Sequence, residues 1–329
     1  MHAKFSVAMC TYNGTRFVAE QLASIAAQTR PPDELVVCDD RSTDATPECI
    51  REFARSAPFP VRLFENEKNI GSTKNFERAV ELCEGDFIAV ADQDDVWLPE
   101  KLRRLEEMLA NKSTGLAFTD GDVVDENLRP LGQRVWQRIR FGEEEQRLFR
   151  EGRAFAVLLD HNVVTGAALA LKAEFKKLIL PFPNDLTHDG IPVLHDWWTA
   201  LLVAAAGEVS FVPESLFKYR QHSSQQMGVM SEDEHAPPSF RATARRRNTF
   251  SAELHYVRAI RERLSAVGGF AVRANVLTDL EARLTHLETR ALMPERRSRR
   301  IAPVLRELLA RRYHLYSNGL ASAAKDFWL

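Results

Sequence analysis

The first 120 residues alternate between short apolar runs and helical patterns, and this alternation restricts the fold more than any other feature. Five apolar runs have the length and composition of strands, at residues 5–10, 34–38, 61–64, 87–91 and 115–118. The segments between them repeat apolar residues at helical spacing, for example Leu102, Leu105 and Leu109. Strands that alternate with helices through short loops form a mostly parallel sheet covered on both faces. The sequence therefore predicts an α/β fold.

After residue 120 the pattern is less regular. It predicts a strand over 163–171, a buried helix over 197–206 and a short strand over 209–212. A polar stretch that contains proline is typical of a linker and occupies residues 232–240. The helical patterns beyond it are rich in arginine. We therefore expect one domain over residues 1–231, a linker over 232–240 and an α-helical region over 241–329.

The chain carries 44 basic and 46 acidic residues, but the two signs are unevenly distributed. Residues 241–329 hold 18 Lys and Arg against 8 Asp and Glu, whereas residues 1–240 hold 26 against 38. Such asymmetry predicts two parts with different partners. We expect the basic region either to rest on anionic lipid or to be a solvated helical cap or homodimer surface. Its arginines are not interleaved with stacking aromatic residues, so nucleic-acid binding is not expected.

One amphipathic pattern stands out in the basic region. Its apolar residues predict a single helix stripe, formed by Ile301, Val304, Leu305, Leu308 and Leu309, with Arg306, Arg311 and Arg312 elsewhere on that helix. No apolar stretch approaches the roughly 20 residues of a membrane-spanning helix, and the N-terminus shows no secretory pattern. The expected location is cytoplasmic, with peripheral contact at the inner face of the cytoplasmic membrane if the basic region binds lipid.

Polar residues cluster just after three of the predicted strands. They are Thr11-Tyr12-Asn13 after the first strand, Asp39-Asp40 after the second, and Asp92-Gln93-Asp94-Asp95 after the fourth. Parallel strands end at the same edge of a sheet, which is where ligands bind in open α/β folds. Carboxylates gathered there repel one another unless a cation is present. Oxygen ligands of this kind favour Mg²⁺ or Mn²⁺, which would hold a diphosphate.

The chain lacks the glycine-rich phosphate loops of two common nucleotide-binding classes. It has no G-x-G-x-x-G after the first strand and no G-x-x-x-x-G-K-[ST] at any position. A nucleotide is therefore not held as in a dehydrogenase or a P-loop ATPase. A bound metal would have to neutralise the phosphates.

Taken in order, these clusters resemble the motifs of the family 2 glycosyltransferases, which have the glycosyltransferase-A fold. The resemblance covers about residues 4–225. It implies a nucleotide-binding half over about 1–120 and an acceptor half over 121–231. The implied nucleotide and donor contacts are Thr11, Tyr12, Asn13, Asp39, Asp40, Asn69, Gly71, Asn75, Asp92 and Gln93. Asp94 is implied to ligate Mg²⁺ or Mn²⁺, while Asp92 faces the sugar and ribose.

The resemblance also assigns roles in the second half. Asp196 matches the family's catalytic base, and His195 replaces the glutamate that usually precedes it. From the residues alone, Asp196 followed by two tryptophans is equally well interpreted as a helix cap followed by core residues. Trp97, His195 and Trp197 are implied to shape the sugar and acceptor pocket, because sugar C–H surfaces stack on aromatic rings.

A last cluster, Tyr219-Arg220-Gln221-His222, follows the final predicted strand. By resemblance, His222 is a candidate third metal ligand and Arg220 a candidate diphosphate contact through its guanidinium. The combined motifs are similar to a subgroup described as bacterial rhamnosyltransferases, which implies a dTDP-rhamnose donor, with a UDP-sugar as the alternative.

The implied function is metal-dependent, inverting transfer of a sugar to a hydroxyl of a glycan or lipid-linked acceptor in surface polysaccharide synthesis. Two other functions stay open. A sugar-1-phosphate nucleotidyltransferase also combines an α/β sheet, a nucleotide and a metal, but it usually has a glycine-rich basic loop after the first strand. A non-catalytic nucleotide-sugar-binding protein would be expected to have lost some acids, whereas those at 92, 94 and 196 are present.

Overall fold

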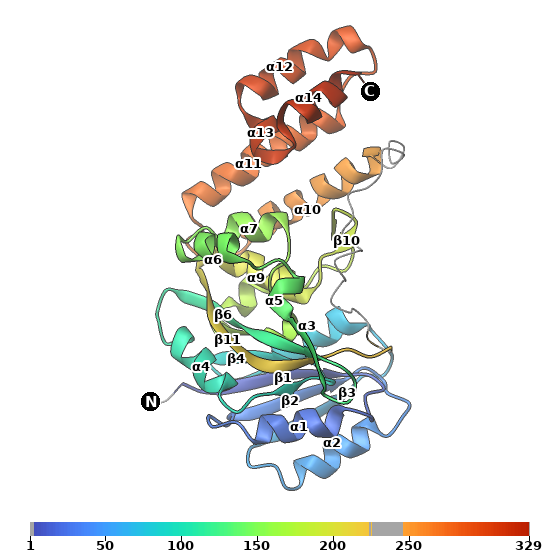
Figure 1. Cartoon of the computed structure of the whole chain (residues 1–329), viewed down its shortest axis with the longest axis vertical. Coiled ribbons are helices and arrows are strands. Elements are labelled where there is room, and N and C mark those ends of the chain that lie inside the picture. The colour runs from blue at the N-terminus through green and yellow to red at the C-terminus, as the bar shows by residue number, and fades with distance from the viewer. Residues whose placement is uncertain (1–2, 224, 226–245, 329) are drawn as a thin grey trace. The chain divides into compact units, whose positions relative to one another are not determined.

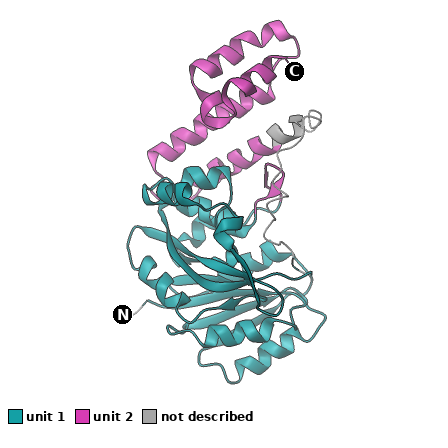
Figure 2. Ribbon diagram, in the orientation of Figure 1, with its two compact units in different colours: residues 1–184, 194–236 teal, residues 185–193, 237–329 magenta. Residues whose placement is uncertain are grey.

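The computed structural model describes residues 3–223, 225 and 246–328. They form two compact units, which Figure 2 distinguishes by colour. The first unit comprises residues 1–184 and 194–236, and the second comprises residues 185–193 and 237–329. The predicted linker over 232–240 lies outside the described residues. The second unit therefore includes a short internal segment from the middle of the chain.

Unit 1 is built on a nine-stranded mixed sheet. The strand order is β3-β2-β1-β4-β8-β6-β11-β5, and β7 pairs with β6. Neighbours among β3, β2, β1 and β4 are parallel, as are β6 and β11, whereas β8 runs antiparallel to β4 and β6. The predicted α/β fold with a mostly parallel sheet is confirmed. The strands are β1 (Phe5–Thr11), β2 (Glu34–Asp39), β3 (Val61–Glu65), β4 (Phe87–Ala91), β5 (Val96–Trp97), β6 (Thr114–Val124), β7 (Pro130–Arg134), β8 (Leu169–Lys172) and β11 (Glu208–Arg220).

Helices cover both faces of this sheet. Figure 1 shows α1 and α2 on one side and α9 on the other, and α3 contacts α9. The sheet is therefore enclosed as the alternating pattern predicts. The helices of unit 1 are α1 (Val18–Ala26), α2 (Thr46–Ala54), α3 (Ser72–Leu82), α4 (Lys101–Leu109), α5 (Val135–Arg138), α6 (Glu143–Arg150), α7 (Ala154–Asp160), α8 (Lys176–Ile179) and α9 (His195–Ala206).

The apolar runs of the sequence form the core. Every residue of β1, β2 and β4 is buried, as expected for strands covered on both faces. The predicted inner face of α4 is also buried, because Leu102, Leu105 and Leu109 are at most 1% exposed. The polar residues that follow β1, β2 and β4 consequently lie at one edge of a well-packed sheet.

Two predicted strands have different bounds in the structure. The strand expected over 163–171 is shorter, because residues Gly166–Ala168 form a 3-10 turn and only β8 pairs with the sheet. The strand expected over 209–212 is longer, because β11 continues to Arg220 through register shifts against β6. Periodicity misses both features, since the turn is itself apolar and the end of β11 is polar. The extension of β11 brings Arg220 to the edge where β4 ends.

Unit 2 combines a small hairpin with a set of helices. The hairpin pairs β9 (Thr187–His188) with β10 (Ile191–Pro192), and β9 contacts α10. Helix α10 contacts α11, and the remaining helices pack on α11 and on one another. The predicted helical character of the C-terminal region is confirmed for its described part. The helices are α10 (Arg246–Ala266), α11 (Ala274–Ala291), α12 (Ile301–Leu309), α13 (Arg312–Tyr316) and α14 (Gly319–Trp328).

The predicted apolar stripe lies on α12, but much of it faces solvent. Val304 is buried, whereas Leu305 and Leu309 are 52% and 85% exposed. The expectation that Arg311 and Arg312 share this helix is wrong. Helix α12 ends at Leu309, and Arg311 adopts a left-handed conformation before α13 begins. None of the described helices is both long enough and apolar enough to span a membrane.

Candidate active site

The first acidic cluster closes the loop after β1. Asp39 ends β2 directly opposite Thr11 in the register of β1 and β2. Its carboxylate accepts hydrogen bonds from the Thr11 hydroxyl at 2.7 Å and from the Ser42 backbone N–H at 2.8 Å and hydroxyl at 2.6 Å. Asn13 joins the same loop, because its side-chain oxygen accepts the Thr43 N–H at 2.8 Å. These bonds hold the ends of β1 and β2 together, with Asn13 exposed at the surface.

The neighbouring carboxylate organises a different loop. Asp40 is 3% exposed, and it accepts the backbone N–H groups of Ile70 and Gly71 at 2.8 and 2.9 Å. Gly71 has a φ of 83°, a backbone conformation that favours glycine. The Asn69 side chain donates to the Asp40 carbonyl at 3.3 Å. The structure therefore brings together Asp40, Asn69 and Gly71, three of the residues predicted to bind the nucleotide or donor.

Asn66 completes this loop, and sequence reasoning missed it. Its amide donates both to Asp40 and to the side-chain oxygen of Asn75, at 2.8 and 2.9 Å. Asn75 in turn donates to the Cys38 carbonyl at 2.7 Å. Asn66 and Asn75 are buried, so they support the loop from within. A signal for Asn66 was present, because it follows β3 as Asp40 follows β2.

Gln93 links the loop after β4 to the loop after β1. Its side-chain oxygen accepts the Tyr12 N–H at 2.8 Å, and its amide donates to the Tyr12 carbonyl at 3.0 Å. The space around Gly14 is closed by the same side chain, because a Cβ atom there would overlap Gln93. Tyr12 itself is 48% exposed. The first and third clusters are thus joined at one edge.

The proposed metal ligands lie beside each other. The Nε2 atom of His222 is 2.8 Å from Oδ2 of Asp94, and both side chains are largely buried. Arg220 links the end of β11 to the loop after β4. Its Nε donates to the Asp94 carbonyl and its Nη1 donates to the Glu126 carbonyl, each at 2.6 Å. The guanidinium also pairs with Glu20 and is 2% exposed. Its partners are therefore protein groups, and the predicted diphosphate contact stays a prediction.

Like charges act on one another in this cluster. Burial, and then the charges of Asp94 and Asp196, raise the pKa of Asp92 to about 7. Burial and the charges of Asp94 and Asp92 likewise raise the pKa of Asp95 well above its usual value. Asp95 accepts the Arg220 N–H at 3.1 Å, while its Oδ2 atom is buried without a hydrogen-bond partner among the described residues. The cluster therefore carries negative charge that its surroundings compensate only in part.

Asp196 belongs to the other half of unit 1, and its charge acts on the acid cluster. It lies in the first turn of α9, half-buried, and it accepts the Gly166 N–H at 3.1 Å and the Trp197 N–H at 2.6 Å. Leu194 rather than Asp196 is the cap of α9. The charge of Asp196 raises the pKa of Asp92 and of Tyr219. The predicted base and the predicted metal cluster thus lie within electrostatic range.

Tyr219 is a second residue that sequence reasoning left without a role. Burial, together with the charges of Asp95, Asp92, Asp94 and Asp196, raises its pKa well above 10. A phenol with a raised pKa keeps its proton and can donate a hydrogen bond. The sequence feature that could have pointed to Tyr219 is its position directly before Arg220 in a polar segment.

His195 lines the inner side of α9. Its ring stacks on Phe76, with centroids 4.1 Å apart, and Nε2 lies close to Gly166. Burial lowers its pKa, although the charge of Asp196 acts in the opposite direction. Neither ring nitrogen has a hydrogen-bond partner among the described residues. Burial therefore disfavours the charged imidazole next to the predicted base, and both ring nitrogens keep their hydrogen-bonding capacity.

Trp97 and Trp197, which are predicted to shape the sugar and acceptor pocket, are both buried in this structure. Trp97 is 2% exposed and Trp197 is 3% exposed. The Trp197 indole donates to the Leu158 carbonyl at 2.6 Å, and the Trp97 ring packs against Lys101. A ring this buried has no face to offer a sugar. The structure places both rings in the core.

A divalent cation fits the residues present. Asp94 and His222 offer an oxygen and a nitrogen side by side, and the unpartnered oxygen of Asp95 and the raised pKa of Asp92 indicate uncompensated charge. The described part of the chain has no group of three His, Cys, Asp or Glu side chains that completes a metal site. Mg²⁺ commonly takes one or two protein carboxylates and completes its shell with substrate phosphates and water. The donor set therefore fits a metal that binds together with a diphosphate.

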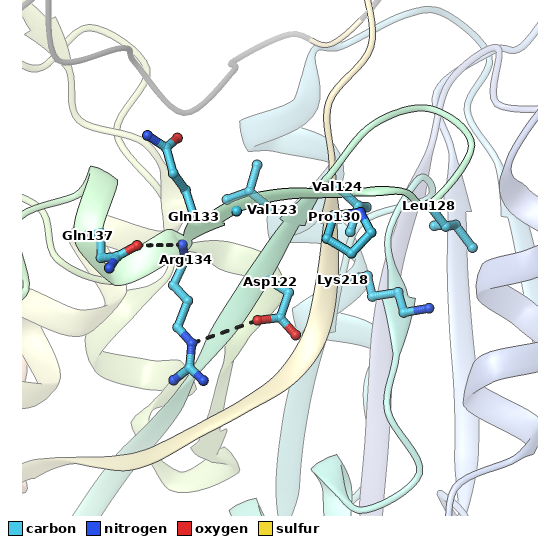
Figure 3. A pocket seen from close by; sticks show the side chains of 10 residues that line it. Asp122, Val123, Val124, Leu128, Pro130, Gln133, Arg134, Gln137 and Lys218 are labelled. Atoms are coloured by element: carbon cyan, nitrogen blue, oxygen red, sulfur yellow. Dashed lines mark hydrogen bonds and ion pairs between the residues drawn. The ribbon is translucent and has the colours of Figure 1, made fainter.

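A separate pocket lies where β6, β7 and β11 meet. Figure 3 shows Arg134 extending toward Asp122, 3.8 Å away, with Lys218 on the side of Leu128 and Pro130. Its volume is about 410 Å³, within the range of small-molecule sites. None of the site residues predicted from the sequence lines it.

Comparisons with known proteins agree with this geometry. The family described as Glycosyl transferase family 2 matches residues 6–174, which is just over half of the chain. An uncharacterised protein of Mycobacterium tuberculosis is 27% identical over 221 residues, 66% of this chain and 59% of that protein. The chain thus spans about 59% of the length of that relative. The dTDP-rhamnosyl transferase RfbG of Shigella flexneri is 27% identical over 233 residues, 67% of this chain and 74% of that protein.

Two solved structures share the fold. S. aureus TarS in complex with UDP-GlcNAc superposes with a TM-score of 0.56 at 19% identity, covering 95% of this chain and 82% of that one. The mannosyltransferase PcManGT from Pyrobaculum calidifontis, in complex with GDP-Man and Mn²⁺, has a TM-score of 0.51 at 19% identity and covers 99% and 84%. At these identities the likeness concerns the fold alone.

Proposed function

Because this chain belongs to glycosyl transferase family 2, and has the glycosyltransferase-A fold, we propose that it is a metal-dependent, inverting glycosyltransferase. The donor is a nucleotide-sugar, with dTDP-rhamnose favoured and a UDP-sugar as the alternative. The acceptor is a hydroxyl of a glycan or lipid-linked sugar in surface polysaccharide synthesis. The similarity to a dTDP-rhamnosyl transferase over 67% of the chain supports the donor.

One observation carries the proposal. After burial and the charge of Asp94, the charge of Asp196 also raises the pKa of Asp92, although Asp92 and Asp196 come from opposite halves of unit 1. An inverting transfer needs a metal-binding group on the leaving side and one base on the attacking side. The juxtaposition of Asp92 and Asp94 with Asp196 supplies that arrangement.

In the proposed reaction, Asp196 takes the proton of the acceptor hydroxyl as the oxygen attacks the anomeric carbon. The N–H groups of Gly166 and Trp197 keep its carboxylate oriented. A single displacement inverts the configuration and needs no nucleophilic Ser or Cys. Asp94 and His222 would hold Mg²⁺ or Mn²⁺, which supplies stabilisation of the negative charge on the departing diphosphate.

The nucleoside is proposed to bind at the ends of β1 and β2, where Thr11, Tyr12, Asn13, Asp39 and Asp40 lie. Asp39 and Asp40 are almost fully buried and bonded to the chain, so we assign them the role of shaping this surface. Exposed Tyr12 and Asn13 are the groups available to the base and ribose. This assignment makes residues 1–120 the nucleotide half and residues 121–231 the acceptor half.

Donor identity can be tested by thermal shift with Mn²⁺ and dTDP-rhamnose, UDP-glucose or GDP-mannose, because a bound ligand raises apparent stability by mass action. Release of free nucleoside diphosphate in the presence of acceptor supports glycosyl transfer. Release of pyrophosphate from a nucleoside triphosphate and a sugar-1-phosphate would instead identify a nucleotidyltransferase. Binding of a donor without turnover of any acceptor or water would identify a binding protein.

The proposal extends to peripheral contact between unit 2 and the inner face of the cytoplasmic membrane. Exposed Ile301, Leu305 and Leu309 lie on α12 next to a basic segment that includes Arg297 and Arg299. Apolar side chains flanked by arginines bind anionic lipid surfaces. Co-sedimentation with phosphatidylglycerol vesicles at low salt but not with phosphatidylcholine vesicles supports this contact. Concentration-dependent dimerisation without vesicle binding would indicate a homodimer surface instead.

A further inference from the structure

The pocket where β6, β7 and β11 meet is lined by charged side chains from three neighbouring strands. Asp122 of β6 is in register with Arg134 of β7 on one side and with Lys218 of β11 on the other. Residues paired in this way project from the same face of a sheet. The three side chains therefore form one row across the pocket, with an acid between two bases (Figure 3).

The two basic side chains keep their hydrogen-bond donors available. Arg134 lies 3.8 Å from Asp122 and 3.8 Å from Asp120, and both separations exceed hydrogen-bond distance. Neither the Arg134 guanidinium nor the Lys218 ammonium donates a hydrogen bond to any part of the chain that the structure describes. Both groups can therefore donate to a ligand in the pocket.

The charge of the lining favours an anion. Among the lining residues, Arg134 and Lys218 are basic and Asp122 is acidic, which leaves one net positive charge. Asp120 stands behind Arg134, is 3% exposed and accepts the backbone N–H groups of Gly121 and Trp136 at 2.8 and 3.0 Å. Its charge is therefore partly compensated by the chain itself. A carboxylate or a phosphate is the group that such a pair of bases recognises.

The rest of the lining is apolar. Leu128 and Pro130 line the pocket on the side of Lys218, and Val123 and Val124 are buried in β6. The volume of about 410 Å³ is large enough for a small organic ligand. A pocket with apolar walls and a few charged groups fits a ligand that combines an apolar face with one acid group. A sugar that bears a carboxylate or a phosphate has both.

This pocket adjoins the candidate active site through direct contacts. The Val124 carbonyl accepts the Gln221 N–H at 2.8 Å. Arg138 donates to the side chain of Gln133, which lines the pocket, at 2.7 Å and to that of Gln221 at 3.5 Å. Gln221 stands directly before His222, the candidate metal ligand. The wall of the pocket and the end of β11 are thus bonded to each other.

We propose that this pocket binds an anionic sugar of the acceptor, and that Arg134 and Lys218 recognise its carboxylate or phosphate. The word acceptor rests on the proposed function, whereas binding of an acidic sugar to the pocket does not. The consequence is a preference for acceptors that carry an acid group over neutral ones.

Binding is tested by nuclear magnetic resonance titration of isotope-labelled protein, without metal or donor. The probes are methyl glucuronide, glucose 1-phosphate and the neutral methyl glucoside. We expect at least one acidic probe to bind about tenfold more tightly than the neutral one and to shift the signals of residues 122–134. The tighter of the two acidic probes identifies the acid group. Equal affinity for all three probes, or no binding of any, overturns the proposal.

Variants of the lining residues locate the bound acid. Lys218→Met and Arg134→Gln should each weaken binding of the acidic probe about tenfold, and Arg134→Lys, which keeps the charge, should lose less. Arg129→Gln is the matched control, because it removes the same charge from an exposed position between β6 and β7 that does not line the pocket. An equal loss in Arg129→Gln would show that only the overall charge matters, and would overturn the assignment.

Asp122→Asn separates an anionic ligand from a neutral one. An anion is repelled by the Asp122 carboxylate, so this variant should bind the acidic probe severalfold more tightly. A neutral sugar would instead donate a hydroxyl to the carboxylate, and the variant would bind it more weakly. Weaker binding of the acidic probe by Asp122→Asn overturns the proposal.

Turnover tests the link to the acceptor. The substrates are two acceptor disaccharides that differ only in a terminal glucuronate or glucose. We expect Lys218→Met to lower the ratio of kcat/KM for the acidic over the neutral acceptor about tenfold. Sugar transfer by the wild type with no preference between the two acceptors overturns the proposal and leaves the proposed function intact. If the wild type transfers no sugar, the proposed function fails, and the titration still decides whether the pocket binds an acidic sugar.

Discussion

The Nε2 atom of His222 lies 2.8 Å from Oδ2 of Asp94, although 128 positions separate the two residues in the chain. The contact exists because β11 runs parallel to β6 and ends where the loop after β4 passes. In this contact the imidazole nitrogen and the carboxylate oxygen are hydrogen-bonded to each other. A metal that displaces this hydrogen bond gains one nitrogen and one oxygen ligand at once.

Replacing His222 by alanine is expected to weaken Mn²⁺-dependent donor binding about tenfold, and replacing Asp94 by alanine to abolish it. The difference follows because a carboxylate contributes charge as well as a ligand atom. Calorimetric titration of nucleoside diphosphate with Mn²⁺ and with EDTA measures both effects. Equal donor affinity in the two metal conditions, for the wild type, would remove the metal from the proposed site.

Asp196→Asn is expected to lower kcat by roughly 10²–10⁴, the usual contribution of a general base. The amide keeps one acceptor for the N–H groups of Gly166 and Trp197 but does not take a proton. Donor affinity should stay within about twofold of the wild type, because Asp196 lies on the acceptor side. Transfer rates and nucleotide binding are measured in parallel, with Glu174→Gln, an exposed acid, as the control. Normal turnover of Asp196→Asn would show that another group is the base.

The arrangement of the polar clusters could be predicted from the sequence, because the end of each apolar run shows where a strand ends. Asp39, Asp94 and Asp196 all lie where the motifs place them, at the ends of β2 and β4 and in the first turn of α9. A motif of this kind fixes the backbone position of a residue. It does not fix what the side chain touches.

Burial and partner choice could not be predicted for the same reason. Trp97 and Arg220 belong to or follow polar motifs, yet each is at most 2% exposed. Trp97 contacts Lys101 of α4 and pairs with Phe217 of β11, and the Arg220 guanidinium pairs with Glu20 of α1. The sequence does contain one indication that Lys101 is buried. It stands four and eight residues before Leu105 and Leu109, on the helix face that those leucines bury. A charged residue in line with a buried face indicates a hidden partner, but its identity depends on the tertiary structure.

Asp92 predicts a pH dependence of stability that a metal should remove. Its pKa is about 7 in the folded protein and near 4 when unfolded, so the folded state binds more protons between these values. Stability therefore falls as pH rises through this window, and the cost is fully present above pH 7. Asp92→Asn should raise the melting temperature by on the order of 5 °C at pH 8 and little at pH 5. Saturating Mn²⁺ should reduce the gain at pH 8.

The measurement is a melting curve of wild type and variant at each pH, so that other titrating groups cancel in the difference. Asp160→Asn, an exposed acid at the end of α7, should change neither value. A gain that is equal at pH 5 and pH 8 would mean that the change acts through packing. It would then carry no information on the charge of Asp92.

Unit 2 contains a second titrating group, a histidine whose charged form is favoured in the folded state. The His188 ring lies 2.6 Å from Oε2 of Glu253, and Glu253 also accepts the Asp189 N–H at 2.8 Å, which fastens the β9–β10 hairpin to α10. Burial opposes ionisation of His188, but the hydrogen bond and charge of Glu253 outweigh it and raise the pKa. The stabilisation is therefore fully present below the unfolded pKa of about 6.5. It is lost as pH rises through the folded value.

His188→Gln is accordingly expected to speed hydrogen exchange in the hairpin at pH 6 far more than at pH 9. Hydrogen bonds to a charged partner contribute about 1.5–3 kcal/mol, which corresponds to roughly a tenfold to hundredfold change in the opening equilibrium. Exchange of residues 186–193 followed by mass spectrometry, corrected for the intrinsic pH dependence, measures the effect. His255→Gln is the control, because His255 and its partner Asp185, 3.4 Å away, are both exposed to solvent. The same acceleration at both pH values would show that the pair holds the hairpin without a change of charge.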